Sequence, residues 1–138
     1  MDKLTLDNLE DFLRGTAFLG TGGGGDPYVG GLMLRQELEK GTDCKIIKGS
    51  EVDDNDLIIP IAVMGAPTVI VERLPNAKSC IKALRKMEEL MGKKAAALIG
   101  AEAGGINGTL PFILSSYTGL PVIDGDGMGR AFPELQMC

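Results

Sequence analysis

The sequence predicts an α/β fold, a three-layer α/β/α sandwich around a mixed or mostly parallel sheet. Apolar residues at helical spacing alternate with short runs rich in Ile and Val. Glycine-containing turns separate these runs, which gives the strand, turn, helix, strand order of parallel βαβ units. With 138 residues, 44% of them hydrophobic, the chain can build one core of ordinary size. We therefore expect residues 1–138 to form a single α/β domain.

The N-terminal part of the chain predicts two helices joined by a glycine-rich loop. Apolar positions at helical spacing indicate an amphipathic helix over residues 5–19. Residues 20–27 contain too many glycines for regular structure, but they let the backbone come close to a partner. A second helix is expected over residues 29–39, ending at Gly41.

Three β-type runs are expected next, over residues 44–48, 57–63 and 68–72. They are rich in Ile and Val and are separated by Gly, Pro, Asp and Asn, which is typical of strands. A helix is expected over residues 77–91, because one of its faces is apolar and Gly92 follows as a stop.

The C-terminal part of the chain predicts one further βαβ unit. A short buried strand is expected over residues 95–100, a helix over 110–117 and a second strand over 120–124. Parallel pairing of these strands would place the helix on a face of the sheet.

Charge and hydropathy restrict the expected partners and location. The chain has 14 Lys and Arg against 19 Asp and Glu, the wrong sign for a phosphate-binding surface, so nucleic acid is not expected as a partner. No apolar run approaches the roughly 20 residues that span a bilayer, and the N-terminus lacks the features of a signal peptide. We expect a cytoplasmic protein that does not bind membranes.

The chain has no histidine, which removes imidazole bases, Ser-His-Asp triads and HExxH zinc sites from its own residues. Cys44, Cys80 and Cys138 show no CxxC spacing, so reduced thiols are expected. Cys44 and Cys80 fall on predicted apolar faces, which favours core packing over nucleophilic chemistry.

Acidic and amide residues follow three of the predicted strands. Ligands of open α/β sheets bind beyond the carboxyl ends of the strands, where Glu72, Glu102–Asn107 and Asp124–Arg130 are expected to lie. Carboxylates gathered there could form an acid and base pair or an all-oxygen metal site. Asp and Gly together are also ordinary turn chemistry, so a structural role stays open.

The glycine loop matches GxGxxG literally through Gly20, Gly22 and Gly25. A dinucleotide fingerprint needs a strand before the first glycine, whereas an amphipathic helix is predicted here, and the GK[ST] ending of a Walker loop is missing. No nucleotide cofactor is expected. Two roles stay open for this loop: it contacts an anion or substrate, or it is a structural turn.

Four segments occur in the order FLGTGGGGDPYVGG, GAPTVIVERLP, EAGGINGTLPF and GLPVIDGDGMGRAFPELQM. Together they closely resemble the N-terminal domain of the S-methyl thiohydantoin desulfurase family, which is associated with hydantoinase and oxoprolinase systems. Proteins of that family are longer, with the α/β domain followed by a β-rich second domain. The resemblance implies that residues 1–138 are the N-terminal part of such a protein, a separate subunit or a gene fragment.

The resemblance implies a hydrolase that removes a sulfur substituent from a hydantoin-like ring, with water adding to the carbon between the two nitrogens and a thiol leaving. On position and residue type, Glu102 or Asp126 is the expected catalytic base. Asn107 and Arg130 are expected to position the substrate, although an ion pair with Glu134 is an equal interpretation for Arg130. The loop residues expected to contact the substrate are Thr21, Gly22, Gly23, Gly24, Gly25 and Asp26.

An alternative interpretation is a non-catalytic binding or assembly subunit of a hydantoinase or oxoprolinase-type system. The short chain and its lack of histidine fit this interpretation. The expected partners are a small hydantoin-like substrate and either further copies of the chain or a partner subunit. The sequence leaves the need for a divalent metal open.

Overall fold

The computed structural model describes residues 2–73, 76–132, 134 and 136, and it describes Pro67, Ile70 and Val71 by their backbone alone. The elements in chain order are β1 (Lys3–Leu4), α1 (Leu6–Gly20), α2 (Pro27–Glu39), β2 (Cys44–Ile47), the 3-10 turn η1 (Gly49–Glu51), β3 (Leu57–Ile61), α3 (Pro67–Glu72), α4 (Ala77–Met91), β4 (Ala95–Gly100), α5 (Gly105–Thr118) and β5 (Val122–Asp126).

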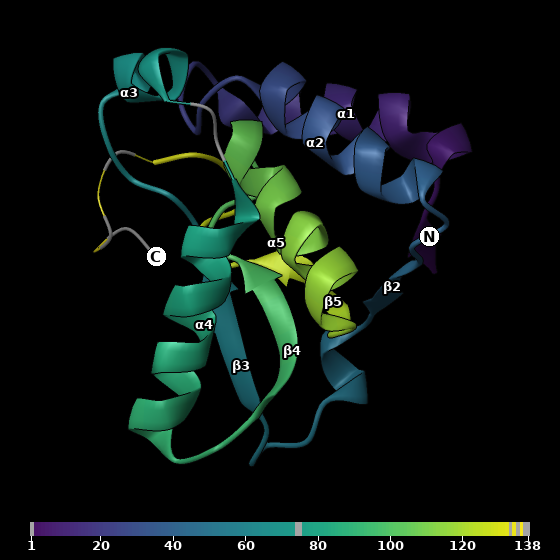
Figure 1. Ribbon diagram of the computed structural model, residues 1–138, viewed down its shortest axis with the longest axis vertical. Helices are drawn as coiled ribbons and strands as arrows, with labels where there is room; N and C mark the ends of the chain where they lie inside the picture. The colour runs from purple at the N-terminus through teal and green to yellow at the C-terminus, as the bar shows by residue number, and fades with distance from the viewer. Residues whose placement is uncertain (1, 74–75, 133, 135, 137–138) are drawn as a thin grey trace.

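The strands form one sheet in the order β1-β2-β5-β4-β3. Among the described strands, β1 alone runs antiparallel to its neighbour, while β2, β5, β4 and β3 are mutually parallel. The prediction of an α/β sandwich built on a mostly parallel sheet is confirmed. Parallel strands end at the same edge, so the loops that follow β3, β4 and β5 lie close together (Figure 1).

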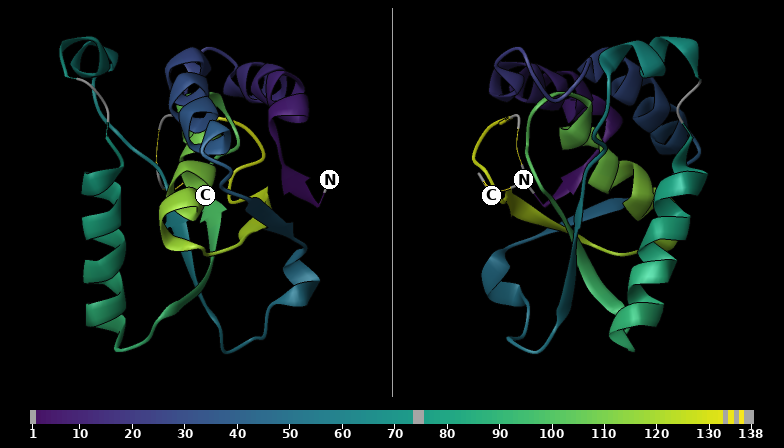
Figure 2. Two further views of the ribbon diagram at one scale, coloured as in Figure 1. Left: turned by 45° about the vertical axis from the view of Figure 1, so that its right-hand side comes forward. Right: turned by 90° about the vertical axis from the view of Figure 1, so that its left-hand side faces the viewer.

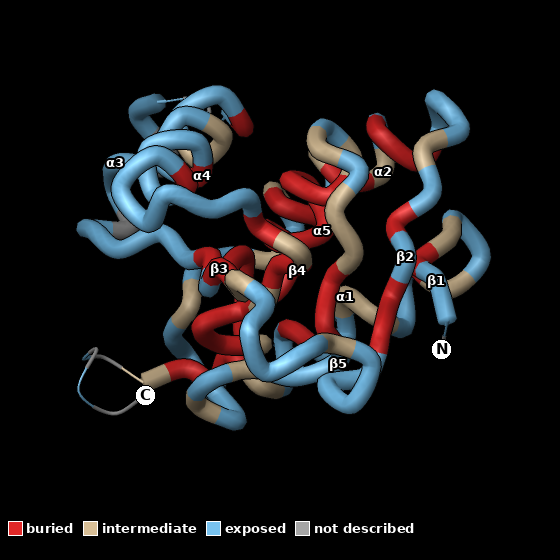
Figure 3. The backbone as a smooth tube through the Cα atoms, turned by 90° about the horizontal axis from the view of Figure 1, so that it is seen from below, coloured by how far each residue is buried: buried red, intermediate tan, exposed pale blue. Residues whose placement is uncertain are grey.

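Helix α5 is the centre of the fold. It is buried from Gly105 to Ser115, and α1 and α2 lie side by side across it (Figures 1 and 2). Figure 3 shows buried residues concentrated in α5 and the inner strands. The main core joins the helices to one face of the sheet through Leu9, Leu34, Leu84, Leu98, Ile113, Leu114 and Val122. Burial of these side chains supplies most of the driving force for this packing.

The other face of the sheet has a smaller apolar cluster. Ile47, Ala97 and Ile123 are buried there, from three neighbouring strands. Partly buried side chains pack around them, and these are Val52, Ile58 and Ile99. The inner strands are thus apolar on both faces, which is typical of a parallel sheet.

The prediction of a strand over residues 68–72 is wrong, because Pro67–Glu72 forms helix α3. Pro67 occupies the first turn of the helix, where its fixed φ favours helix and its missing N–H costs nothing. The N–H of Arg73 closes the helix on the carbonyl of Val69 at 2.9 Å. Figure 2 shows α3 standing out from the other helices.

Helix α5 begins at Gly105, five residues before the predicted start at residue 110. Gly105, Asn107 and Gly108 are weak helix formers, and their tight packing against α1 and the glycine loop outweighs that propensity. The remaining predicted helices and strands are confirmed within two residues at each end. Among the described residues, no helix combines the length and the apolar character needed to cross a membrane.

Candidate functional site

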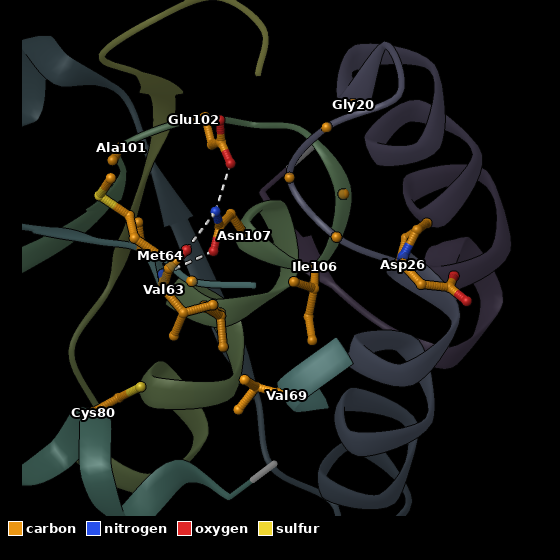
Figure 4. A pocket seen from close by; sticks show the side chains of 18 of the residues that line it. Gly20, Asp26, Val63, Met64, Val69, Cys80, Ala101, Glu102, Ile106 and Asn107 are labelled. Carbon is orange, nitrogen blue, oxygen red and sulfur yellow. Dashed lines mark hydrogen bonds between the residues drawn. The ribbon is translucent and has the colours of Figure 1, made fainter. Parts of the chain in front are cut away.

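A cavity of about 960 Å³ lies at the carboxyl edge of the sheet, beyond the ends of β3 and β4. Most of its lining comes from three parts of the chain: the glycine loop between α1 and α2, the turn and first residues of α5, and the described residues between Ala62 and Cys80. The remaining lining residues are Ala17, Met33, Met128, Phe132 and Glu134. Figure 4 shows side chains from these separate parts facing one space. The position is the one at which open parallel sheets bind ligands.

The glycine loop packs backbone to backbone against the turn before α5. Gly24 and Gly105 both have positive φ, +72° and +61°. A Cβ on Gly24 would lie 2.5 Å from the carbonyl oxygen of Gly104, and one on Gly105 would lie 2.4 Å from the carbonyl of Gly24. The N–H of Asn107 donates to the carbonyl of Gly24 at 3.3 Å. Glycine is required at both positions, because any side chain would separate the two walls.

Glu102 and Asn107 form a buried polar pair at one end of the cavity. Their exposed fractions are 6% and 5%. Asn107 Nδ2 donates to Glu102 Oε1 at 2.5 Å and to the carbonyl of Val63 at 3.2 Å, and Asn107 Oδ1 accepts from the N–H of Val63 at 2.9 Å. The carboxamide therefore fixes the carboxylate and ties it to the loop after β3 (Figure 4).

The second carboxylate oxygen of Glu102, Oε2, has no hydrogen-bond partner among the described residues. Within that part of the chain, no fully buried side-chain oxygen lacks a partner, so Oε2 keeps some contact with solvent. Glu102 itself lines the cavity. The carboxylate also lies just before the N-terminus of α5, where the helix dipole stabilises negative charge. An oriented carboxylate with one free oxygen is the arrangement that a base or a hydrogen-bond acceptor needs.

Asp126 does not line the cavity. Its Oδ2 accepts from the N–H of Ala103 at 2.8 Å, and its Oδ1 accepts from the N–H of Gly129 at 2.9 Å. These bonds hold the turn that carries Glu102 against the end of β5. The structure therefore places Asp126 behind the cavity wall, in a supporting position.

Arg130 and Thr21 lie together at the outside of the glycine loop. The guanidinium of Arg130 lies 3.9 Å from the centre of the Phe132 ring and donates to the carbonyl of Ala131 at 3.1 Å. It also reaches Thr21 Oγ1 at 3.5 Å. Phe132 lines the cavity and Arg130 does not, and among the described residues, which include Glu134, Arg130 makes no ion pair.

Asp26 lines the cavity together with Gly22–Gly25. Its Oδ1 accepts from the N–H of Tyr28 at 2.9 Å, which caps the start of α2. Figure 4 shows its carboxylate pointing away from Glu102. The two acids therefore share the cavity without forming a pair.

Glu72 and Asp124, the other acids considered, are both exposed. Glu72 ends helix α3, so it does not follow a strand as predicted. Across residues 2–73 and 76–132, no three His, Cys, Asp or Glu side chains gather closely enough to hold a metal ion. Within those residues, the acids of this chain do not form a metal site by themselves.

Sequence analysis missed the wall formed by the segment from Ala62 to Cys80. Val63 and Val69 come from the strands predicted over residues 57–63 and 68–72, Met64 and Arg73 follow directly after them, and all four line the cavity. Cys80 packs against the main core, as predicted, and it is half-buried and also lines the cavity. The one available signal was Pro67, whose place before a short apolar run also fits the start of a helix.

The described cysteines are free thiols in apolar surroundings. Burial raises the pKa of Cys44, whose Sγ lies 3.4 Å from the carbonyl oxygen of Phe112. Burial also raises the pKa of Cys80. Both thiols are therefore protonated at neutral pH and poor nucleophiles. Cys138 lies outside the described residues.

Fold and site together define an α/β domain with a ligand cavity at the carboxyl edge of a parallel sheet. The model of the family described as "S-Me-THD-like, N-terminal domain" matches residues 7–138. The chain belongs to this family, which confirms the resemblance seen in its four loop segments.

A solved structure has a similar fold. An X-ray crystal structure of a protein from Chromobacterium violaceum is similar over 98% of this chain, with a TM-score of 0.72 and 26% sequence identity. The match covers 37% of that longer chain. No curated protein matches this sequence significantly.

Proposed function

We propose that this domain provides the substrate cavity and the base of a hydrolase that removes a thiol from an S-substituted thiohydantoin ring. The observation that carries the proposal is the oriented carboxylate of Glu102, which lines a cavity of about 960 Å³ and has one oxygen held by Asn107 and the other without a hydrogen bond among the described residues. Membership of the S-Me-THD-like family supports the choice of substrate class.

Glu102 Oε2 takes a proton from water as the water oxygen bonds to the ring carbon between the two nitrogens. The electron pair of the C=N bond moves to the ring nitrogen. The intermediate then forms a carbonyl, and its hydroxyl proton passes to the ring nitrogen. The C–S bond breaks with its electron pair on sulfur, and Glu102 returns its proton to the departing thiolate. The products are a hydantoin and a free thiol.

Bare backbone supports this chemistry on the wall that faces the ring. Gly22, Gly24, Gly25 and Gly105 carry no side chain that would cover their N–H groups, whereas the N–H of Gly23 already donates to the carbonyl of Gly20 at 2.7 Å. Such N–H groups can stabilise the negative charge that develops on ring nitrogen and oxygen atoms. Asn107 contributes indirectly, because its polar atoms are already bonded to Val63 and Glu102.

The Glu102→Gln variant tests the proposal. The carboxamide oxygen of the new side chain can still accept from Asn107, so the local structure is kept while the base is lost. We expect turnover of S-methyl thiohydantoin, measured as thiol release, to fall about 10²- to 10⁴-fold. Binding of the hydantoin product should be retained. Glu72→Gln, an exposed acid outside the cavity, is the matched control and should keep wild-type turnover. Unchanged turnover in Glu102→Gln would remove Glu102 from the mechanism.

The second candidate function is a binding module that completes its site with another domain or subunit. It is favoured by the coverage of the Chromobacterium violaceum protein, of which this chain spans 37%. Calorimetry and turnover on the same sample separate the two functions. Binding of hydantoin without turnover by the chain alone, and turnover once the longer relative's remaining part is added, would favour the module.

A further inference from the structure

We propose that two copies of this chain pair across a twofold axis, through the end of the molecule opposite the cavity. The pairing surface consists of the exposed C-terminal part of α4 and the acidic loop over residues 51–56. Both segments lie at the amino edge of the sheet, because β4 begins shortly after α4 and β3 begins directly after the loop. Figures 1 and 2 show them at the same end of the molecule. The pairing leaves the cavity at the carboxyl edge open, so it is independent of the proposed function.

The apolar face of α4 extends beyond the core of its own domain. Ala77 and Leu84 are buried on this face, with exposed fractions of 8% and 1%. Met87, Leu90 and Met91 follow at a spacing of three and four residues, which places them on one side of the helix. They are 44%, 70% and 58% exposed. These three side chains form the α4 patch, an apolar surface that is open to solvent in the single chain.

Cations are concentrated on α4 and the turn that follows it. Residues 77–94 hold six of the 14 Lys and Arg residues of the chain: Lys78, Lys82, Arg85, Lys86, Lys93 and Lys94. They hold two acids, and one of these, Glu88, already pairs with Arg85 and Lys94. In a chain with more acids than bases, α4 is therefore a basic surface beside the α4 patch.

The acidic loop lies beside the end of α4. Residues 51–56 contain no Lys or Arg and four exposed acids, which are Glu51, Asp53, Asp54 and Asp56. Lys93 donates to the carbonyl of Asn55, which holds the loop against the turn after α4. Among the described residues, none of the four acids forms an ion pair. The loop therefore presents negative charge next to a basic helix.

A twofold axis perpendicular to α4 at the α4 patch brings these opposite charges together. It makes the two α4 helices antiparallel, with Met87, Leu90 and Met91 of each copy against the same residues of the other. Lys82 lies five residues before Met87, and Lys93 lies six residues after it. At a rise of about 1.5 Å per residue, the acidic loop beside Lys93 of one copy lies level with Lys82 of the other. The contact occurs twice, which is the self-complementary arrangement of twofold homodimers.

Sedimentation equilibrium measures the pairing. We expect the mass of this chain to rise from monomer to dimer as its concentration increases to about 1 mM. Leu90→Gln removes apolar surface from both copies, so its dissociation constant should be at least about tenfold higher than that of the wild type. Leu32→Gln, at an exposed leucine of α2, is the matched control and should dimerise as the wild type does. A wild-type chain that stays monomeric throughout would overturn the proposal.

Two charge reversals test the twofold arrangement. Asp54→Lys adds a cation to the acidic loop, and Lys82→Glu adds an acid to the basic helix. Among the described residues, neither side chain has a hydrogen bond or an ion pair to lose. Each variant alone should dimerise about tenfold more weakly than the wild type, because the axis repeats the repulsive contact.

An equimolar mixture of the two reversed variants should dimerise as tightly as the wild type. One of its two contacts has the natural charges, and the other has both charges exchanged, so both are attractive. Recovery in the mixture also shows that both variants are folded. A mixture that pairs no more tightly than the separate variants, or a dimer that Leu90→Gln and both reversals leave unchanged, would overturn this interface.

Discussion

The carboxamide of Asn107 pairs in both directions with the peptide groups of Val63, 44 residues earlier in the chain. It accepts from the N–H of Val63 at 2.9 Å, donates to its carbonyl oxygen at 3.2 Å, and still donates to Glu102. One buried side chain thus joins the loop after β3 to the carboxylate at the start of α5. Asn107 is accordingly a positioning residue, since its polar atoms are occupied without substrate.

Replacing Asn107 by Leu should cost about 1–3 kcal/mol of unfolding free energy, because the N–H of Val63 and Glu102 Oε1 lose a buried partner. Urea denaturation measures this loss. Turnover should fall more than substrate affinity, since the base loses its orientation and the cavity keeps its shape. Asn107→Asp keeps the acceptor for Val63 but opposes Glu102 with a second acid, so the pH dependence of turnover should shift as well. Identical pH profiles for wild type and Asn107→Asp would contradict the positioning role.

Asp126→Asn should weaken the contact between two loops. Asp126 joins Ala103, in the turn before α5, to Gly129, in the loop after β5. The amide presents an NH₂ group to one of the two backbone N–H donors, so one hydrogen bond is lost, at about 1–3 kcal/mol. We expect a lower melting temperature with a pH profile of turnover unchanged in shape, because Asp126 lies outside the cavity lining. A displaced limb of that profile would instead make Asp126 part of the acid and base chemistry.

Gly24→Ala and Gly105→Ala should each destabilise the domain by at least about 1–2 kcal/mol, the cost of a left-handed conformation for a residue with a Cβ. The new methyl groups would also meet backbone atoms of the facing wall at 2.4–2.5 Å. Gly15→Ala is the control, because a Cβ there meets nothing within 4 Å and the position lies inside α1. That variant should gain about 0.5–1 kcal/mol in thermal or urea denaturation.

Glu88 should make stability fall in acid. Hydrogen bonds from Arg85 and from the N–H of Ala95 lower its pKa from 4.5 to about 2, so the folded state favours the ionised form. This contribution is complete above the unfolded pKa of 4.5 and is lost as the pH falls toward 2. Urea denaturation at several pH values should show the decline between these limits. The Glu88→Gln variant should be less stable than wild type at pH 7 and show a smaller decline, and parallel curves would contradict this assignment.

Much of the fold was predictable because local pattern and tertiary packing agree. In α4, apolar spacing, a good helix composition and Gly92 all point to the bounds that the structure shows. Agreement failed where packing overrode propensity. The residues Gly105, Asn107 and Gly108 read as a loop, but the crowded contact with the glycine loop makes them the first turn of α5.

The site was predictable only in part. Position after a strand singled out Glu102 and Asn107, because the ends of parallel strands meet at one edge. The glycine loop, which follows a helix, was singled out by its glycine content. The same rule could not show that Asp126 turns its carboxylate to backbone N–H groups, since that depends on the course of the loops. Nor could it find Cys80, whose helical spacing is the same for a core face as for a cavity wall.

The cavity has one wall of bare main chain and one wall of side chains, and the two differ in what mutation can change. Gly24 and Gly105 admit almost no replacement, so the first wall is fixed in shape. Val69 and Cys80 can be exchanged for larger or smaller residues without disturbing that contact. New ligand preferences should therefore arise by altering the segment between Ala62 and Cys80, which makes it the region to randomise in directed evolution of this domain.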